Sequence, residues 1–347
     1  MPLPWCMASL LVALSVALAG RAEAAEAAGA SSGAGVIASD VMQATGDGVD
    51  GAGAAAGAGA GLARRLAMPA LAVIALGAFF ARRLHRLPER PAGATRAGWI
   101  MSDASDGRSL PTGASRAARR AALLLALAAA MFVLQQIGIS TAMALAARLA
   151  PAPTEMAAAA RTQGLGAIGL VVAQLPVLAA AALLVSRPGA RRGREALLGL
   201  LAMAAAWPVV ATTAMVAIAL RARFIGEPTD PIGHEVLRLI LDDGSGAWRL
   251  ALIGYAVIGA PVVEEVLYRG LLQQAGRAIG LSPWSAIAAT SALFAAAHWS
   301  VVAPPALAAL VVLGLLFGWL RERTGGLTSP IVAHAAFNVA NLVIATA

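Results

Sequence analysis

Long apolar stretches, separated by loops that carry most of the charges, dominate the chain after residue 61. Each stretch reaches or approaches the roughly 20 residues that a helix needs to cross the hydrocarbon layer of a membrane, which is about 30 Å thick. We place the stretches at 66–81, 121–147, 164–186, 196–220, 248–272, 283–299, 304–320 and 327–347. The pattern predicts an all-α fold, a polytopic integral membrane helical bundle with about eight transmembrane helices. In the seventh stretch, the spacing of Gly314 and Gly318 favours close helix packing.

Arginines gather in alternate loops. The loop 82–120 carries nine Arg and the loop 187–195 carries four. The loop 148–163 has two, and 221–247 has three against five acidic residues. Basic loops tend to remain in the cytoplasm. We therefore expect the arginine-rich loops inside the cell and residues 25–61 outside.

The N-terminal region has a different character from the rest of the chain. It opens with an apolar run of signal-peptide length, and residues 22–24 resemble a cleavage site, although no positive charge precedes the run. Residues 1–24 are therefore expected to be a signal peptide or signal-anchor. Residues 25–61 are rich in Gly and Ala, which predicts a flexible linker without a packed core. N-terminal transmembrane helices and loops then occupy 62–247, and a C-terminal core occupies 248–347.

The composition supports a membrane protein and argues against a nucleic-acid partner. Hydrophobic residues make up 59% of the chain and charged residues 13%, whereas a soluble domain has about 25% charged residues. The net charge is +8, but the arginines are spread over loops rather than clustered among aromatics as in a nucleic-acid patch. The expected partner is the lipid bilayer. With Cys6 as the only cysteine, the chain has no intrachain disulfide and no cysteine metal site.

Three charges interrupt the apolar stretch 248–272, in the sequence VVEEVLYRGLL. On a helix, Glu265 and Arg269 are four residues apart and can pair on one face. Glu264 points about 100° away and has no local partner. A charge at the centre of a membrane helix costs roughly 2.5–3.5 kcal/mol, and such residues usually face a bundle interior or a water-filled cavity. An ion pair explains Glu265 and Arg269, but Glu264 needs another explanation.

Two of the four histidines also lie in apolar stretches. His298 follows Phe294 by one helical turn, and His334 precedes Asn338 by one turn. Taken singly, each could be a core histidine that hydrogen-bonds across helices. Together with Glu264 they form a hydrolytic set: a carboxylate base for water, an imidazole to hold that water or protonate the leaving amine, and a His–Asn pair for an oxyanion. Alternatively, Glu264, His298 and His334 could ligate a divalent metal such as zinc, although no HExxH motif is present.

The three motifs resemble those of a known family. EEVLYRG, FAAAH and HAAFN match the EExxxR, FxxxH and HxxxN motifs of the CPBP intramembrane proteases. This family includes the type II CAAX prenyl endopeptidases and the bacteriocin-processing or self-immunity proteins, also called Abi. The resemblance covers roughly 248–347, which would then be a catalytic core. It implies an endopeptidase that cuts a membrane-associated peptide or protein.

The resemblance also implies a role for each motif residue. Glu264 would activate the attacking water with help from His298. His334 and Asn338 would stabilise the oxyanion. The remaining motif residues would support the site: Glu265, Arg269 and Phe294. A glutamate-type mechanism without a metal is favoured over a metal-dependent one.

Two other classes of function fit parts of the pattern. A non-enzymatic bacteriocin self-immunity or membrane scaffold protein could use the same fold to bind a partner. A proton relay or transporter could also use intramembrane Glu and His, but transporters often have repeated halves, and the polar clusters here fall only in the last hundred residues. For the favoured protease, we expect a multi-pass protein of the bacterial inner membrane, for which prenylated CAAX substrates are not expected.

Overall fold

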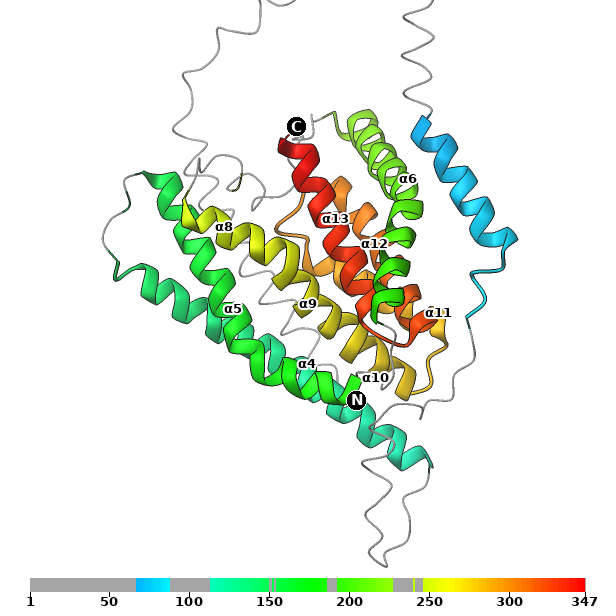
Figure 1. Cartoon of the computed structure of the whole chain (residues 1–347), viewed down its shortest axis with the longest axis horizontal. Coiled ribbons are helices and arrows are strands. Elements are labelled where there is room, and N and C mark those ends of the chain that lie inside the picture. The colour runs from blue at the N-terminus through cyan, green and yellow to red at the C-terminus, as the bar shows by residue number, and fades with distance from the viewer. Residues whose placement is uncertain are drawn as a thin grey trace, which may run out of the picture. The chain divides into compact units, whose positions relative to one another are not determined.

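The computed structural model describes residues 67–87, 113–149, 152, 154–185, 192–226, 240 and 246–346. All of them belong to one compact unit, Leu66–Ala347. Regular secondary structure in these residues is entirely helical (Figure 1). The predicted all-α class is therefore confirmed. The signal segment predicted at 1–24 and the linker predicted at 25–61 lie outside the described residues.

Among the described residues, four helices with defined bounds precede the C-terminal region. A short helix, Ala67–Ala81, comes first. The three that follow are long: α4 is Gly113–Ala146, α5 is Glu155–Val185 and α6 is Arg192–Ile225. At 1.5 Å per residue each of the three is longer than the hydrocarbon layer is thick, so each can cross a bilayer with tilt.

The C-terminal region begins with one long helix that contains two π-helical parts. Its consecutive parts are α8 (Ala247–Gly254), the π-helical η1 (Tyr255–Gly259), α9 (Ala260–Glu265), the π-helical η2 (Val266–Leu272) and α10 (Gln273–Ala278). Three helices follow: α11 (Pro283–Ala297), α12 (Pro304–Thr324) and α13 (Thr328–Thr346). π-helical turns often occur at functional sites. Glu264 and Glu265 lie in the short α9, between the two π-helical parts.

The interrupted helix occupies the middle of the bundle. The antiparallel pair α4 and α5 packs on one side of it, and α13, which also contacts α6 and α12, packs on the other (Figure 1). One hydrophobic cluster joins α4 and α5 to η2, and a second joins α6, α12 and α13. The charged part of the helix therefore lies at the junction of two apolar clusters.

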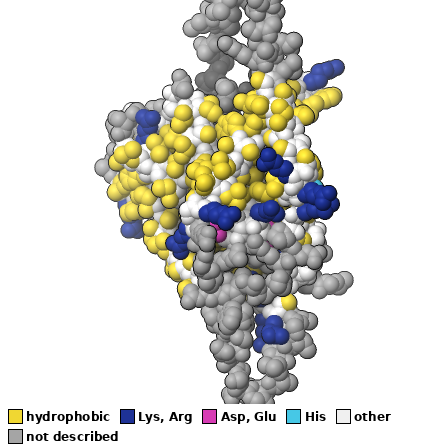
Figure 2. Space-filling model, turned by 45° about the vertical axis from the view of Figure 1, so that its right-hand side comes forward, with side chains coloured by type: hydrophobic (Ala, Val, Ile, Leu, Met, Phe, Trp, Pro, Cys, Tyr) yellow, Lys and Arg dark blue, Asp and Glu magenta, His cyan; other side chains and the backbone are white. Residues whose placement is uncertain are grey.

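Six helices in the described residues are long and apolar enough to cross a membrane. The other two predicted segments form shorter apolar helices, Ala67–Ala81 and Pro283–Ala297. The polytopic helical bundle is thus confirmed. Hydrophobic side chains form a broad surface on the face shown in Figure 2, and basic side chains gather along its lower border. Large apolar residues such as Leu183 and Leu250 are 62% and 71% exposed, as expected for contact with lipid.

Glycines allow the closest helix contacts. A Cβ atom placed on Gly314 would lie 2.8 Å from Ser291 Cβ, and one on Gly318 would lie 2.9 Å from Ile287 Cγ2. Real Cβ atoms do not approach other atoms so closely, so α11 and α12 pack there with no room for a side chain. The close packing predicted from the spacing of these two glycines is confirmed.

Two tryptophans mark one end of the bundle. Trp319 Nε1 on α12 donates a hydrogen bond to Leu84 O at 2.9 Å, and Trp284 Nε1 on α11 donates to His85 O at 3.0 Å. Tryptophan is enriched where the membrane meets water. The turn that accepts these bonds follows the helix Ala67–Ala81 and carries three arginines: Arg82, Arg83 and Arg86. This end of the bundle is therefore at the arginine-rich side.

Candidate active site

A fully buried ion pair forms the inner part of the site. Arg269 Nε lies 3.3 Å from Glu265 Oε2, and neither side chain has exposed surface. Arg269 also donates from Nη2 to Gly314 O on α12 at 3.0 Å. Its guanidinium carbon lies 4.9 Å from the centroid of the Phe294 ring and 5.5 Å from that of Phe317, and both rings attract the cation. The pairing predicted from the four-residue spacing is confirmed.

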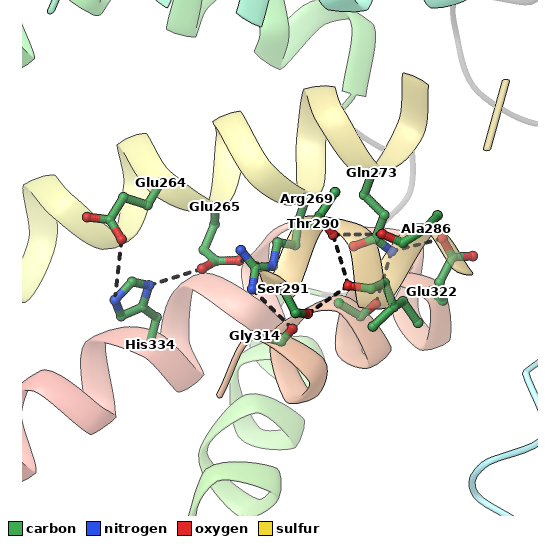
Figure 3. A network of polar contacts seen from close by, with 12 residues as sticks. Glu264, Glu265, Arg269, Gln273, Ala286, Thr290, Ser291, Gly314, Glu322 and His334 are labelled. Carbon is green, nitrogen blue, oxygen red and sulfur yellow. Dashed lines mark hydrogen bonds and ion pairs between the residues drawn. The ribbon is translucent and has the colours of Figure 1, made fainter. Parts of the chain in front are cut away.

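His334 connects the two glutamates (Figure 3). Its Nδ1 lies 3.0 Å from Glu265 Oε1, and its Nε2 lies 3.9 Å from Glu264 Oε2. The imidazole stacks on the Phe317 ring, with the centroids 4.9 Å apart and the planes 18° apart. Since α13 supplies His334 and α9 supplies both glutamates, this contact fixes the two helices relative to each other.

His298, the residue that directly follows α11, lies near Glu264. Its Nδ1 lies 2.7 Å from Phe294 O, one turn earlier. A carbonyl oxygen only accepts hydrogen bonds, so Nδ1 carries a hydrogen, and a neutral His298 then has its lone pair on Nε2. That Nε2 lies 3.9 Å from Glu264 Oε2. Phe294 therefore sets the orientation of His298 through its backbone, and contacts Arg269 through its ring.

Glu264 lies where the two histidines converge. Its Oε2 is buried and has no hydrogen-bond partner among the described residues. The separations of 3.9 Å to both Nε2 atoms are too long for direct hydrogen bonds. The Glu264 side chain is 21% exposed and that of His298 is 18% exposed. Water can therefore reach this part of the site, in contrast to the buried pair beside it.

Asn338 has a different neighbour. Its Nδ2 donates to Ala256 O in η1 at 2.7 Å. Within the described part of the chain, no hydrogen bond joins Asn338 to Glu264, His298 or His334. The amide thus ties α13 to the first π-helical part, and its second N–H hydrogen is left for other contacts.

Further polar side chains extend from Arg269 towards the end of α10 (Figure 3). Gln273 Nε2 donates to Gly318 O at 3.2 Å and to Glu322 Oε1 at 3.0 Å. Arg277 Nε lies 3.8 Å from Glu322 Oε2. We call Arg269, Gln273, Glu322 and Arg277 the polar column. Sequence reasoning missed Gln273 and Glu322, although the four-residue steps from Arg269 to Gln273 and Arg277 are visible in the sequence.

The candidate metal ligands lie slightly farther apart than a bound zinc ion would hold them. The candidate ligand atoms are Glu264 Oε2 and the Nε2 atoms of His298 and His334. Zinc bonds of about 2.1 Å in a tetrahedral arrangement place ligand atoms roughly 3.4 Å apart, whereas both separations here are 3.9 Å. In the residues that the structure describes, no group of three or more His, Cys, Asp or Glu is placed to hold a metal ion.

Comparison with known proteins agrees with the motifs. Residues 246–340 match the family model described as type II CAAX prenyl endopeptidase Rce1-like. The match begins just before α8, ends within α13 and contains all three motifs. Neither the curated proteins nor the solved structures include a match to the chain. The C-terminal region of this chain is therefore similar to the Rce1-like type II CAAX prenyl endopeptidases, consistent with a protease of the CPBP family.

Proposed function

We propose that the chain is an intramembrane endopeptidase that hydrolyses a peptide bond of a membrane-associated peptide or protein. One observation carries the proposal. The buried Oε2 of Glu264 has no hydrogen-bond partner among the described residues and faces the Nε2 atoms of two histidines at 3.9 Å. An unpartnered carboxylate oxygen between two imidazoles is costly for stability, and it suits a group that holds water for reaction.

Glu264 and His298 hold the attacking water in this mechanism. A carboxylate oxygen accepts one hydrogen of the water, and the Nε2 lone pair of a neutral His298 accepts the other. The water oxygen then presents its lone pairs to the substrate. As it bonds to the carbonyl carbon, its proton passes to Glu264. When the C–N bond breaks, that proton moves to the leaving amine, and Glu264 returns to its ionised form. No step requires a metal.

His334 supplies positive charge for the oxyanion. In this role His334 carries a hydrogen on both ring nitrogens, so that it donates through Nδ1 to Glu265 and through Nε2 to the developing oxyanion.

The other motif residues position these groups. Glu265 holds His334, and Arg269 compensates the charge of Glu265. Phe294 accepts the hydrogen bond from His298. Asn338 uses one N–H hydrogen for Ala256 O and offers the second to the oxyanion.

The test compares Glu264→Gln with a matched control, Glu155→Gln, at the exposed start of α5. Peptide termini in the membrane proteome of cells that carry each variant are measured against wild type. We expect a set of termini to disappear with Glu264→Gln and to remain with Glu155→Gln. If cells with Glu264→Gln have the same peptide termini and the same phenotype as cells with the wild-type protein, the protein is instead a non-enzymatic self-immunity or scaffold protein. We propose that the protein resides in the inner membrane of bacterial cells.

A further inference from the structure

The site is closed on the arginine-rich side. Arg269 and Gln273 have no exposed surface, and Glu322 is 8% exposed. These side chains fill the space between η2, α10 and α12 with hydrogen bonds to Gly314 O and Gly318 O. A peptide chain cannot pass through the polar column without breaking these bonds.

Helix packing closes the same half of the bundle. The glycine contacts between α11 and α12 leave no room for a Cβ atom at Gly314 or Gly318. Several helix ends also converge on this side. Arg323 Nη1 donates to Arg86 O at 3.4 Å, and Ser329 Oγ donates to Glu195 O at 2.7 Å. The arginine-rich end is therefore tied together by contacts from α6, α12, α13 and the turn that carries Arg86.

Exposure increases in the opposite direction. Along the interrupted helix, Arg269 and Glu265 are fully buried, whereas Glu264 is 21% exposed. On α13, His334 is followed by two half-buried amides, Asn338 about one turn later and Asn341 about two turns later, in the direction away from the arginine-rich side. Polar side chains within a membrane helix usually face a bundle interior or a water-filled cavity.

The loop 298–303 forms the boundary of the site at this end. His298 lies 14 positions after Trp284 on α11, which corresponds to about 21 Å at 1.5 Å per residue. α11 thus ends short of the roughly 30 Å needed to cross the hydrocarbon layer, so the loop that follows it begins within the depth of the bilayer. Non-helical backbone at such a depth is tolerated where it lines a water-filled cavity, and Trp299 in this loop is 68% exposed.

From this placement we infer that the substrate reaches Glu264 from the side of the membrane opposite the arginine-rich loops. The positive-inside rule assigns the arginine-rich side to the cytoplasm. The substrate class is then an exported peptide, or the outward-facing part of a membrane-anchored protein, and not a cytoplasmic C-terminus. This inference rests on the proposed protease function for the nature of the substrate, but not for the direction of the opening.

Cysteine labelling in whole cells tests the direction. Cys6→Ser removes the only native cysteine. Val301→Cys then places a thiol in the loop 298–303, and Ile279→Cys places one after α10; both positions are exposed. The probe is a charged maleimide that does not cross membranes. We expect Val301→Cys to be labelled in intact cells and Ile279→Cys only after permeabilisation. Labelling of Val301→Cys only after permeabilisation, or not at all, would overturn the inference.

Cleavage products give a second, independent measurement. The termini that depend on Glu264 are mapped onto the topology of the proteins that contain them. We expect the cleaved bonds on the extracytoplasmic side of each membrane anchor, and bonds on the cytoplasmic side would contradict the inference. We also expect a loss of cleavage when Val301→Cys is labelled and none when Ile279→Cys is labelled. If no terminus depends on Glu264, the protease function fails, while the labelling pattern still decides on which side the site opens.

Discussion

The Nδ1 atom of His334 lies 3.0 Å from Oε1 of Glu265. The second glutamate of the pair, which is fully buried, therefore orients the imidazole, and the first is left to face water. Glu264 and Glu265 thus have different roles, because their side chains leave the helix in different directions.

Replacing Glu265 with Gln should reduce both stability and activity. The change leaves Arg269 buried without a counter-ion, and removing one member of a buried ion pair typically costs about 3–5 kcal/mol. His334 also loses the carboxylate that faces its Nδ1 atom at 3.0 Å. Thermal unfolding in detergent and a cleavage assay measure the two effects. In the double variant Glu265→Gln/Arg269→Gln, stability should recover more than activity; equal recovery of both would argue against the orienting role.

Glu264→Gln should lower the activity without lowering the stability of the protein. The amide keeps the shape of the side chain but removes a charge whose buried Oε2 atom has no hydrogen-bond partner in the described residues, so the melting temperature of the purified protein should stay constant or rise. Loss of a general base typically lowers the rate by roughly 10²–10⁴-fold. A large drop in melting temperature would indicate that Glu264 has a structural role.

Gly314→Ala should loosen the α11–α12 contact. The added methyl group would lie 2.8 Å from Ser291 Cβ, and overpacking of this kind typically costs about 1–3 kcal/mol. Displacement of the Gly314 carbonyl also weakens its bond to Arg269, so activity should fall with stability. Gly166→Ala on α5 is the control, because no described atom outside its own helix surroundings lies within 4 Å of the added Cβ. Equal effects of the two changes on the unfolding temperature would refute this account.

The polar column should contribute to stability more than to chemistry. Gln273→Leu removes a donor from the buried carboxylate of Glu322, at a typical cost of about 1–3 kcal/mol. In the double variant Gln273→Leu/Glu322→Leu the unpaired carboxylate is gone, and Arg277, whose side chain is 21% exposed, can turn to water, so stability should partly return. Because Gln273 contacts no reacting group, the folded fraction of each variant should cleave at nearly the wild-type rate per molecule. A specific loss of kcat without a change in unfolding would show that the column acts in the reaction.

Removal of metal ions should leave cleavage unchanged. The proposed mechanism uses Glu264, His298 and His334 on a water molecule, with separations wider than those around zinc. Purified protein is treated with a chelator, its residual metal is quantified, and cleavage is measured before and after. Activity that disappears with the metal and returns when zinc is added would establish the metal-dependent mechanism instead.

Short-range features of the site could be read from the sequence. The Glu265–Arg269 pair follows from four-residue spacing on one helix, and the close α11–α12 contact follows from Gly314 and Gly318. The sequence also indicated that Glu264 lacks a local partner. These inferences need only the geometry of a single helix, and they do not depend on how the helices are arranged in space.

Contacts between helices could not be read in the same way. Nothing in the sequence distinguishes which glutamate faces His334 Nδ1, because this depends on how α9 is rotated relative to α13. Asn338 was expected beside His334 by its one-turn spacing, yet its amide donates to Ala256 O across the α13–η1 contact. Such partners depend on helix rotation, which the packing of the whole bundle determines.

The shortness of α11 also has a consequence for the surrounding lipid. Its 15 residues extend about 22 Å, and Leu293 near its end is 53% exposed. Lipid beside this helix meets an apolar face several ångströms shorter than an average hydrocarbon layer. A bilayer adapts to such mismatch by thinning, at a cost of fractions of a kcal/mol per Å. A bilayer of lipids with shorter acyl chains should therefore need less thinning beside α11. The thickness of the membrane should thus affect the helix that carries Phe294 of the site.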